Sequence, residues 1–164
     1  MIFITVGTHE QPFNRLVEYM DKWALSHDEE VIIQTGYTKY EPSNCKWQNF
    51  YKQDVMDELT RRSRIIITHG GPSCYIESIN FGKFPIVVPR RREFGEHIDD
   101  HQLLIGREFK ERYGNIILIE DIEKLGGVIE QYDSIVSGLQ DKRFVSHSRE
   151  FCDSLSNIID QLFS

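Results

Sequence analysis

The chain has 164 residues, a formal net charge of −7 and a sequence pI of about 5.4. This length suits one domain with a real hydrophobic core, so we expect residues 1–164 to form a single domain. The acidic balance argues against a nucleic-acid partner, because nonspecific binding to nucleic acid needs a basic surface. No run approaches the roughly 18 apolar residues of a membrane span, and no charged leader precedes the first strand, so we expect a cytoplasmic protein.

Apolar spacing predicts strands that alternate with helices along the chain. The strands are expected at 2–6, 30–35, 46–51, 64–68, 85–89 and 115–119, and the helices at 12–26, 54–63, 73–81 and 97–112. Continuous apolar runs such as Ile65-Ile66-Ile67 suit parallel strands that are covered on both faces. The predicted fold class is therefore α/β, a Rossmann-like parallel sheet with helices on both faces.

Two further helices are predicted after the last strand. Apolar residues at three- and four-residue spacing run from Ile122 to Leu139, and again from Phe151 to Leu162. We expect both helices to pack on the domain, although the heptad-like regularity of the first leaves a partner helix as an alternative. The three cysteines, Cys45, Cys74 and Cys152, show no C-x-x-C spacing, which favours a reduced compartment over disulfides or a cysteine-built zinc site.

Glycine turns follow two of the predicted strands. In His69-Gly70-Gly71-Pro72-Ser73 the glycines let the backbone approach a bound group, and Pro72 suits the first position of a helix. The free N–H groups of such a helix end favour an anion, most plainly a phosphate, and ligands of an open α/β sheet bind at this edge. Gly7-Thr8 is a second turn of this kind, unless Gly7 only closes a strand–helix connection. The Thr8 and Ser73 hydroxyls can add hydrogen bonds to phosphate oxygens.

The segment THGGPSCYIESINFGKFPIVVP, followed by H-Q about a dozen residues later, resembles the carboxyl-terminal nucleotide-sugar domain of family 28 glycosyltransferases. Together with the opening IFITVGTHEQPF, it is similar to the small, split members of that family, the Alg13-like and PssE-like subunits. In those enzymes one chain carries the donor domain and a separate membrane-associated chain carries the acceptor domain. The resemblance covers residues 1 to about 110 and implies one half of a GT-B glycosyltransferase.

The resemblance also implies roles for individual residues in binding a UDP-sugar. Glu77 matches a glutamate that accepts hydrogen bonds from the ribose hydroxyls, a task that suits the two oxygens of a carboxylate; the alternative is a solvated helix residue. His101-Gln102 matches the H-Q pair, whose glutamine contacts hydroxyls of the donor sugar. Backbone groups near Tyr51-Lys52-Gln53 are expected to hold uracil. The predicted substrate-binding residues are Gly7, Thr8, Gly70, Gly71, Ser73, Glu77, His101 and Gln102.

An inverting transfer needs a general base to deprotonate the acceptor hydroxyl. Complete relatives take their acceptor-side residues from the other domain, so the partner chain is expected to supply the base, with His9 as the second choice. No D-x-D pair lies on a strand-end loop, so turn N–H groups and helix dipoles are expected to stabilise the departing diphosphate. The prediction therefore includes no metal site and no cofactor.

Two other patterns leave alternatives open. The run Arg90-Arg91-Arg92 is either a solvated loop or a site for a diphosphate, anionic lipid or an acidic partner surface. His97 and His101 stand four residues apart on a predicted helix, a spacing that can bind zinc, but Ile98 occupies the place of the glutamate that metallopeptidase helices need. A nicotinamide dinucleotide is not expected, because the first turn lacks G-x-G-x-x-G.

The sequence thus favours the donor-binding catalytic subunit of a two-chain glycosyltransferase, moving a hexose from a UDP-sugar to a lipid-linked saccharide acceptor in exopolysaccharide or capsule biosynthesis. Its partner is expected to be a membrane-anchored, Alg14-like or PssD-like subunit that brings it to the inner face of the membrane. One alternative is a non-catalytic enhancer of a partner glycosyltransferase. Another is a zinc-dependent hydrolase built on His69, His97 and His101.

Overall fold

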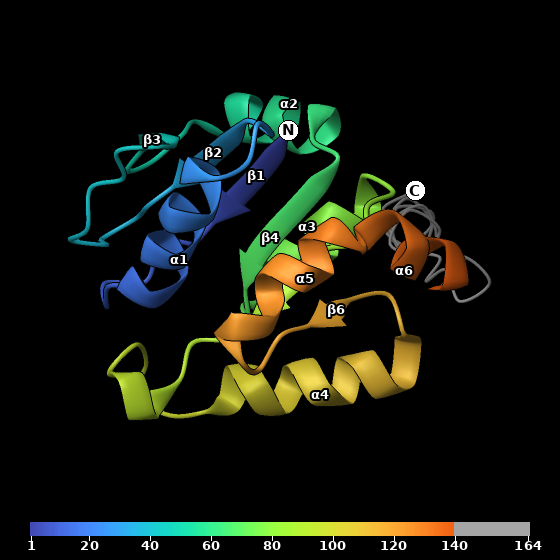
Figure 1. Cartoon of the computed structure of the whole chain (residues 1–164). Coiled ribbons are helices and arrows are strands. Elements are labelled where there is room, and N and C mark those ends of the chain that lie inside the picture. The colour runs from blue at the N-terminus through green and yellow to red at the C-terminus, as the bar shows by residue number, and fades with distance from the viewer. Residues whose placement is uncertain (140–164) are drawn as a thin grey trace, which may run out of the picture.

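The computed structural model describes residues 1–139, in which one parallel sheet has the strand order β3-β2-β1-β4-β5-β6 (Figure 1). The strands are β1 (Ile2–Thr5), β2 (Val31–Gln34), β3 (Lys46–Gln48), β4 (Ile65–His69), β5 (Ile86–Val88) and β6 (Ile117–Leu118). The helices are α1 (Asn14–Leu25), α2 (Gln53–Arg62), α3 (Pro72–Asn80), α4 (His101–Tyr113), α5 (Leu125–Glu130) and α6 (Tyr132–Leu139), with short 3-10 turns η1 (Arg92–Phe94) and η2 (Ile122–Lys124).

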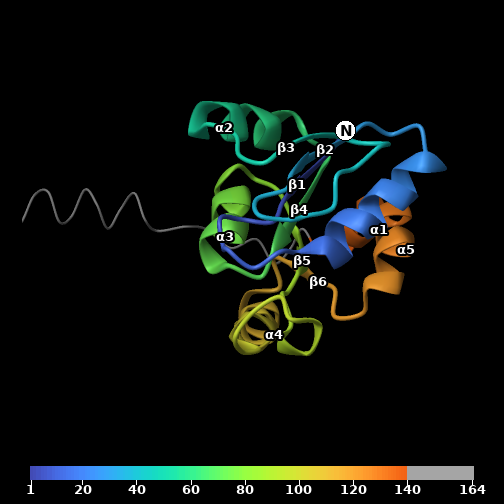
Figure 2. The same ribbon diagram turned by 90° about the vertical axis from the view of Figure 1, so that its left-hand side faces the viewer.

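Helices cover both faces of the sheet, as the continuous apolar runs predicted. Alternate residues of a strand point to opposite faces, so Ile4 and Ile67 pack with α1 and α5, whereas Phe3 and Ile66 pack against α2. Val87 of β5 lies in a third cluster with residues of α3 and α4. Figure 2 shows this layering, with α1 and α5 on one side of the strands and α2, α3 and α4 on the other. The Rossmann-like α/β prediction is confirmed.

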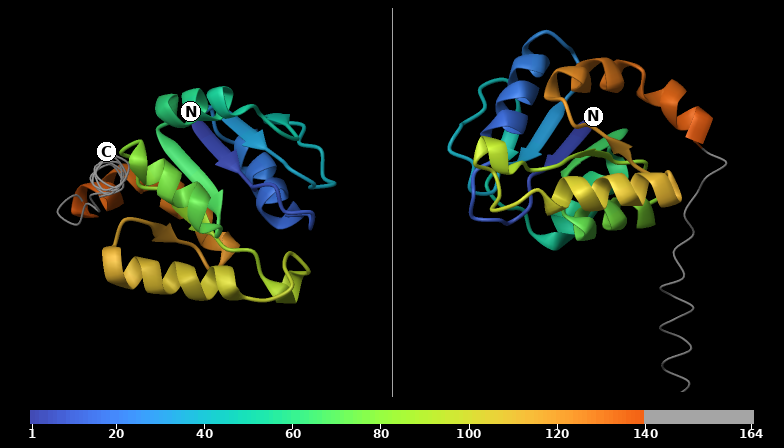
Figure 3. Two further views of the ribbon diagram at one scale, coloured as in Figure 1. Left: turned by 180° about the vertical axis from the view of Figure 1, so that it is seen from behind. Right: turned by 90° about the horizontal axis from the view of Figure 1, so that it is seen from below.

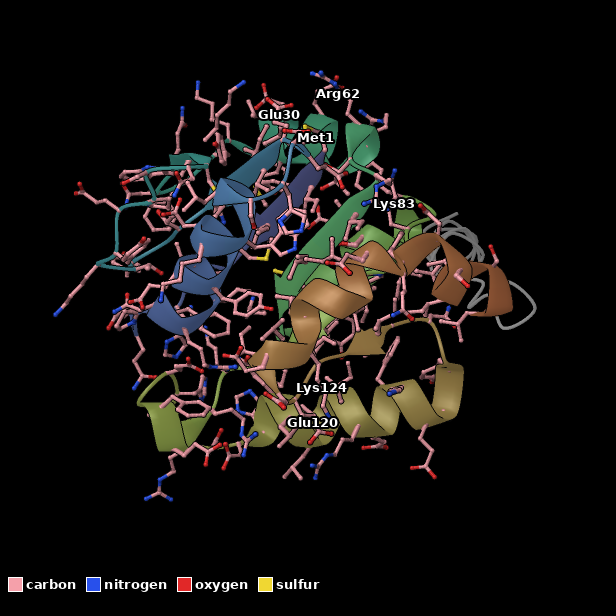
Figure 4. All side chains as sticks on the ribbon, in the orientation of Figure 1. Met1, Glu30, Arg62, Lys83, Glu120 and Lys124 are labelled. Atoms are coloured by element: carbon pink, nitrogen blue, oxygen red, sulfur yellow. The ribbon has the colours of Figure 1, made fainter. Side chains whose placement is uncertain are left out.

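Because all the strands are parallel, they all begin at one end of the sheet and all end at the other. Met1, Glu30 and Arg62, which precede strands, lie at one end of the molecule, and Glu120 and Lys124, which follow β6, lie at the opposite end (Figure 4). Seen from behind, α3 and α4 lie across the same face (Figure 3). Among residues 1–139, no helix has both the length and the apolar character that crossing a bilayer requires.

Two predicted helices differ from the observed ones. The helix expected over 97–112 begins only at His101, because the preceding residues form bends in which Asp99 Oδ1 accepts a hydrogen bond from the His101 N–H at 3.2 Å. His97 and His101 therefore do not share a helix. The helix expected from Ile122 to Leu139 is divided into η2, α5 and α6, with Gln131 leaving the helical conformation at ψ 6°. The helix predicted over 151–162 lies outside the described residues, as does Cys152.

Candidate functional site

The centre of the sheet contains a topological switch. From β1 the chain runs through α1 to β2 on one side, and from β4 it runs through α3 to β5 on the other. In open α/β sheets, ligands bind at the carboxyl ends of the two strands where the direction reverses. Thr5 of β1 pairs with Thr68 of β4, so the turns that begin at Gly7 and Gly70 leave the sheet at nearly the same level. The two glycine turns identified in the sequence therefore face this crevice together.

A cleft of about 680 Å³ opens at the switch point. Its lining residues come from β1 and its following loop, from β2, from the end of β4, from α2 and the segment before it, from α3 and from the start of α4. They are Thr5, Gly7, Thr8, His9, Glu10, Gln34, Phe50, Tyr51, Gln53, Met56, His69, Ser73, Cys74, Glu77 and Gln102. Six of the nine predicted site residues line it, namely Gly7, Thr8, His9, Ser73, Glu77 and Gln102. Gly70 and His101 are next in the chain to the lining residues His69 and Gln102, and Gly71 lies between His69 and Ser73, but none of the three lines the cleft itself.

His69 explains why both turns carry glycine. A Cβ atom on Gly7 would lie 2.4 Å from His69 Cε1, and one on Gly71 would lie 2.3 Å from His69 Nε2. Gly7 also has a φ of 75°, which a residue with a side chain rarely adopts. The imidazole is 8% exposed, and burial, with the nearby Arg90 charge, lowers the pKa of His69 to about 4. A neutral imidazole therefore lies on the cleft floor, held between the two turns.

The beginning of α3 forms one wall of the cleft. Gly71 is the N-cap, Pro72 takes the first helical position as predicted, and no side chain caps the helix. The positive end of the helix dipole is therefore uncompensated at the place where Ser73 lines the cleft. One turn further on, Glu77 Oε1 accepts a hydrogen bond of 2.6 Å from Gln53 Nε2 of α2. This contact brings the segment predicted to hold uracil next to the carboxylate predicted to bind ribose.

Thr5 and Gln34 build the opposite wall, and nothing in their sequence surroundings singled them out. Thr5 Oγ1 accepts hydrogen bonds from the Gly7 N–H at 3.2 Å and from Gln34 Nε2 at 3.1 Å. Gln34 Oε1 in turn accepts from the Tyr51 N–H at 3.1 Å. These bonds fix the turn after β1 relative to the segment before α2. The network forms because β1 pairs with β2, which places Gln34 beside Thr5. The sequence alone does not show this pairing.

Gln102 has a more restricted role than its sequence suggested. Its Oε1 accepts hydrogen bonds from the backbone N–H groups of Gly70 and Arg90, both at 3.1 Å, and the residue is 4% exposed. Two backbone donors fix which end of the amide carries the oxygen. The oxygen is thus occupied inside the protein, which leaves the amide nitrogen as the group that can contact a ligand.

His101 belongs to a cluster of side chains of metal-binding types and does not line the cleft. Its Nδ1 contacts Asp99 Oδ1, and its ring centroid lies 4.6 Å from that of His97, which lies 4.6 Å from that of His9. Among residues 1–139, the ligand atoms of His97, Asp99 and His101 lie within 4.8 Å of one another. His69 is not in this group, so the set of histidines considered for a zinc hydrolase is not assembled. None of the three clustered residues lines the cleft.

The three consecutive arginines have three different environments. Arg90 is completely buried, and its guanidinium donates to the carbonyl oxygens of Gln11 at 2.7 Å and Val6 at 2.8 Å. Arg91 is paired with Glu93 at 2.8 Å and Asp100 at 3.3 Å, whereas Arg92 is exposed. Neither alternative for this run, a solvated loop or a binding site, holds for Arg90, because its buried guanidinium is enclosed by carbonyl groups. Both stay open for Arg91 and Arg92.

A larger cavity, of about 780 Å³, lies beside α1 and includes Arg15, Tyr19 and Phe94. It contains none of the predicted site residues, and Arg15 in it is engaged by Glu96, with two bonds of 2.9 Å. The smaller cleft at the switch point is thus the better candidate for the functional site, because six of the predicted site residues line it.

The sheet order defines a Rossmann-like α/β domain, and its cleft lies at the switch point where such sheets bind ligands. The model of the glycosyltransferase family 28 C-terminal domain matches residues 1–144. The chain therefore belongs to glycosyltransferase family 28, whose activity needs a nucleotide-sugar donor and an acceptor. A comparison with curated protein sequences found no match.

Replacing Gly71 by alanine tests the packing of the turns around His69. We expect Gly71→Ala to lower the free energy of unfolding by about 1–3 kcal/mol, because the added methyl group meets the buried ring. Gly127→Ala is the matched control, since nothing lies within 4 Å of a Cβ at that helical position. Urea denaturation of both variants measures the difference. Equal stability of Gly71→Ala and the parent chain would contradict the observed geometry.

The buried imidazole predicts a specific pH dependence. The folded pKa of His69, about 4, lies below the ordinary value of 6.5, so its contribution to stability is present above pH 6.5 and declines as the pH falls toward 4. The loss amounts to up to about 3 kcal/mol. The unfolding free energy of the parent chain should fall more steeply over this window than that of His69→Asn. Nitrogen-detected NMR should show no protonation of His69 near pH 6.5.

Proposed function

We propose that this chain is the donor-binding catalytic subunit of a two-chain inverting glycosyltransferase, which moves a hexose from a UDP-sugar to a lipid-linked saccharide. One observation carries the proposal: in a family 28 domain, both glycine turns and Glu77 meet at the switch-point cleft. Residues suited to hold a diphosphate and a ribose thus come together around one crevice.

The cleft residues suggest a division of tasks. The backbone N–H of Thr8 and those at the start of α3, with the Ser73 hydroxyl, suit the diphosphate. The Gly7 N–H is already held by Thr5 Oγ1. Glu77 suits the ribose diol, because Gln53 holds one carboxylate oxygen and leaves the other to accept from the ligand. The amide nitrogen of Gln102 is placed to donate to the donor sugar. His101, held by Asp99, is assigned to the outer end of the same subsite.

The hydrogen bonding of His9 favours a base from outside the chain. His9 Nδ1 accepts a hydrogen bond from the Gln11 N–H at 3.2 Å, so a neutral ring carries its proton on Nε2. The nitrogen that is left accessible is then a donor and does not take a proton from an acceptor hydroxyl. His9 suits a hydrogen bond to the leaving diphosphate better than the role of general base, which we assign to the partner subunit.

The remaining parts of the proposal come from the resemblance of the motifs. They are a membrane-anchored partner of the Alg14-like or PssD-like kind, a position at the inner face of the membrane, and exopolysaccharide or capsule biosynthesis. The single domain over residues 1–164 is proposed from the length of the chain. In this proposal the chain binds the donor in the switch-point cleft, and the partner supplies the acceptor side of the reaction centre.

Calorimetric titration of the chain tests donor recognition. We expect binding of UDP in preference to ADP and NAD, and a loss of about 1–3 kcal/mol of UDP binding energy in Glu77→Gln, because the ribose loses a charged partner. Glu111→Gln, at an exposed position of α4, is the control and should bind UDP as the parent does. Equal affinity for all three nucleotides, or none for UDP at millimolar concentration, would count against the proposal.

Dependence on a second chain is tested by reconstitution. The isolated chain should transfer sugar poorly, because orienting the two reactants is worth roughly 7–11 kcal/mol of a barrier and needs the acceptor wall. Transfer to a lipid-linked acceptor should appear after co-purification with a membrane-associated acceptor subunit. Full turnover by the chain alone, unchanged by that subunit, would point to a self-sufficient enzyme. Restored turnover with a Glu77→Gln, Gln102→Leu double variant would instead favour a non-catalytic enhancer.

A further inference from the structure

The two glycine turns are joined by a continuous series of hydrogen bonds through Arg90. The Arg90 guanidinium donates to the carbonyl oxygens of Val6 at 2.8 Å, Gln11 at 2.7 Å and Pro12 at 3.4 Å. These carbonyls begin and end the loop that carries Gly7-Thr8. A fourth bond, of 3.3 Å, goes to the Glu96 carbonyl in the loop before α4. One side chain thus holds both ends of the first turn against the loop that follows β5.

Gln102 continues the connection to the second turn. Its Oε1 accepts from the Arg90 N–H and from the Gly70 N–H, so a single amide oxygen joins the end of β5 to the end of β4. A Cβ on Gly70 would lie 2.7 Å from Gln102 Cβ, which shows how closely this contact is packed. Val6, Arg90, Gln102 and Gly70 therefore form one path across the floor between the two turns.

The environment of Arg90 explains why an arginine is needed. The side chain is fully buried, and its guanidinium lies 4.8 Å from the centroid of the Phe13 ring. A buried charge is tolerated only when several acceptors surround it. The planar fork of a guanidinium reaches several carbonyl groups at once, whereas a lysine ammonium is a single point of contact on a flexible stem. The Glu96 carboxylate, which accepts from the Arg91 N–H at 3.0 Å and is bonded to Arg15, holds the surrounding loop in place.

We propose that Arg90 and Gln102 are positioning residues that set the spacing of the two glycine turns and so preorganise the N–H groups that receive the diphosphate. Arg90 touches no ligand in this arrangement, because carbonyl groups enclose it. Gln102 acts on the turns through its oxygen, separately from any contact of its nitrogen with a sugar. The choice of a diphosphate as ligand rests on the proposed function, whereas the coupling of the turns does not.

UDP is the informative probe, because it lacks the donor sugar. A direct contact between Gln102 and sugar hydroxyls then contributes nothing, and any effect of Gln102 on affinity acts through the turns. The variants are Arg90→Lys, Gln102→Leu and their combination. Tyr132→Phe is the matched control for stability, since it removes a buried 2.9 Å hydrogen bond to the Phe84 carbonyl outside the cleft. UDP affinity is measured by calorimetry at a temperature where circular dichroism shows every chain folded.

We expect each of the two substitutions to weaken UDP by about tenfold, which corresponds to roughly 1.4 kcal/mol. The double variant should lose less than the product of the single effects, because both residues belong to one path. Tyr132→Phe should keep the parent affinity despite its lower stability. The proposal would be overturned if Arg90→Lys and Gln102→Leu remain folded and bind UDP within about twofold of the parent affinity.

Hydrogen exchange of individual amides keeps the test decisive if Arg90→Lys does not fold. Gln102→Glu retains an oxygen acceptor for the Gly70 and Arg90 amides, and Gln102→Leu does not. The Gly70 amide should therefore stay protected in Gln102→Glu and exchange faster in Gln102→Leu. Equal protection in both variants would contradict the coupling. A parent chain that shows this exchange pattern but does not bind UDP would instead sink the proposed function and leave the coupling intact.

Discussion

The pairing of β1 with β4 is the constraint on which the rest of the structure depends. Residues 2–5 align with residues 65–68, and both strands are enclosed by helices on each face. Side chains in the middle of these strands are committed to the core, so only the strand ends can carry function. Because the chain departs from the two strands in opposite directions, their carboxyl ends leave a crevice between them. The position of the cleft follows from strand order before any catalytic residue is considered.

Most polar groups at the cleft floor are already bonded within the protein. Thr5, Gln34 and Gln102 use their oxygens to hold backbone N–H groups of neighbouring segments, and Gln53 holds one oxygen of Glu77. Such a site presents few groups to a ligand but holds them rigidly. Rigid donors and dipoles need little reorganisation when charge develops, which is consistent with the proposed departure of a diphosphate.

The three consecutive arginines show that a basic run in a sequence does not by itself form a basic binding surface. In the sequence Arg90, Arg91 and Arg92 form one basic run, yet one is enclosed by carbonyls, one is paired with carboxylates and one is exposed. Arg90, the buried member, holds backbone carbonyl groups in place. Burial lowers the pKa of Arg90 to about 10, and its charge has no contact with solvent. Favourable potential for an anion in the cleft therefore comes from the uncapped end of α3 and from turn N–H groups.

The sequence by itself determined the alternation of strands and helices, the parallel sheet and the two glycine turns, because periodicity, buried apolar runs and turn residues are local properties. A motif also singled out Glu77 and Gln102, which both line the cleft. Tertiary structure alone decided that His69 fits between Gly7 and Gly71, that Gln34 belongs to the cleft and that Arg90 is buried. These facts depend on which strands are neighbours and on contacts between residues as far apart in the sequence as Val6 and Arg90. Such contacts produce no periodic pattern of residues from which they could be predicted.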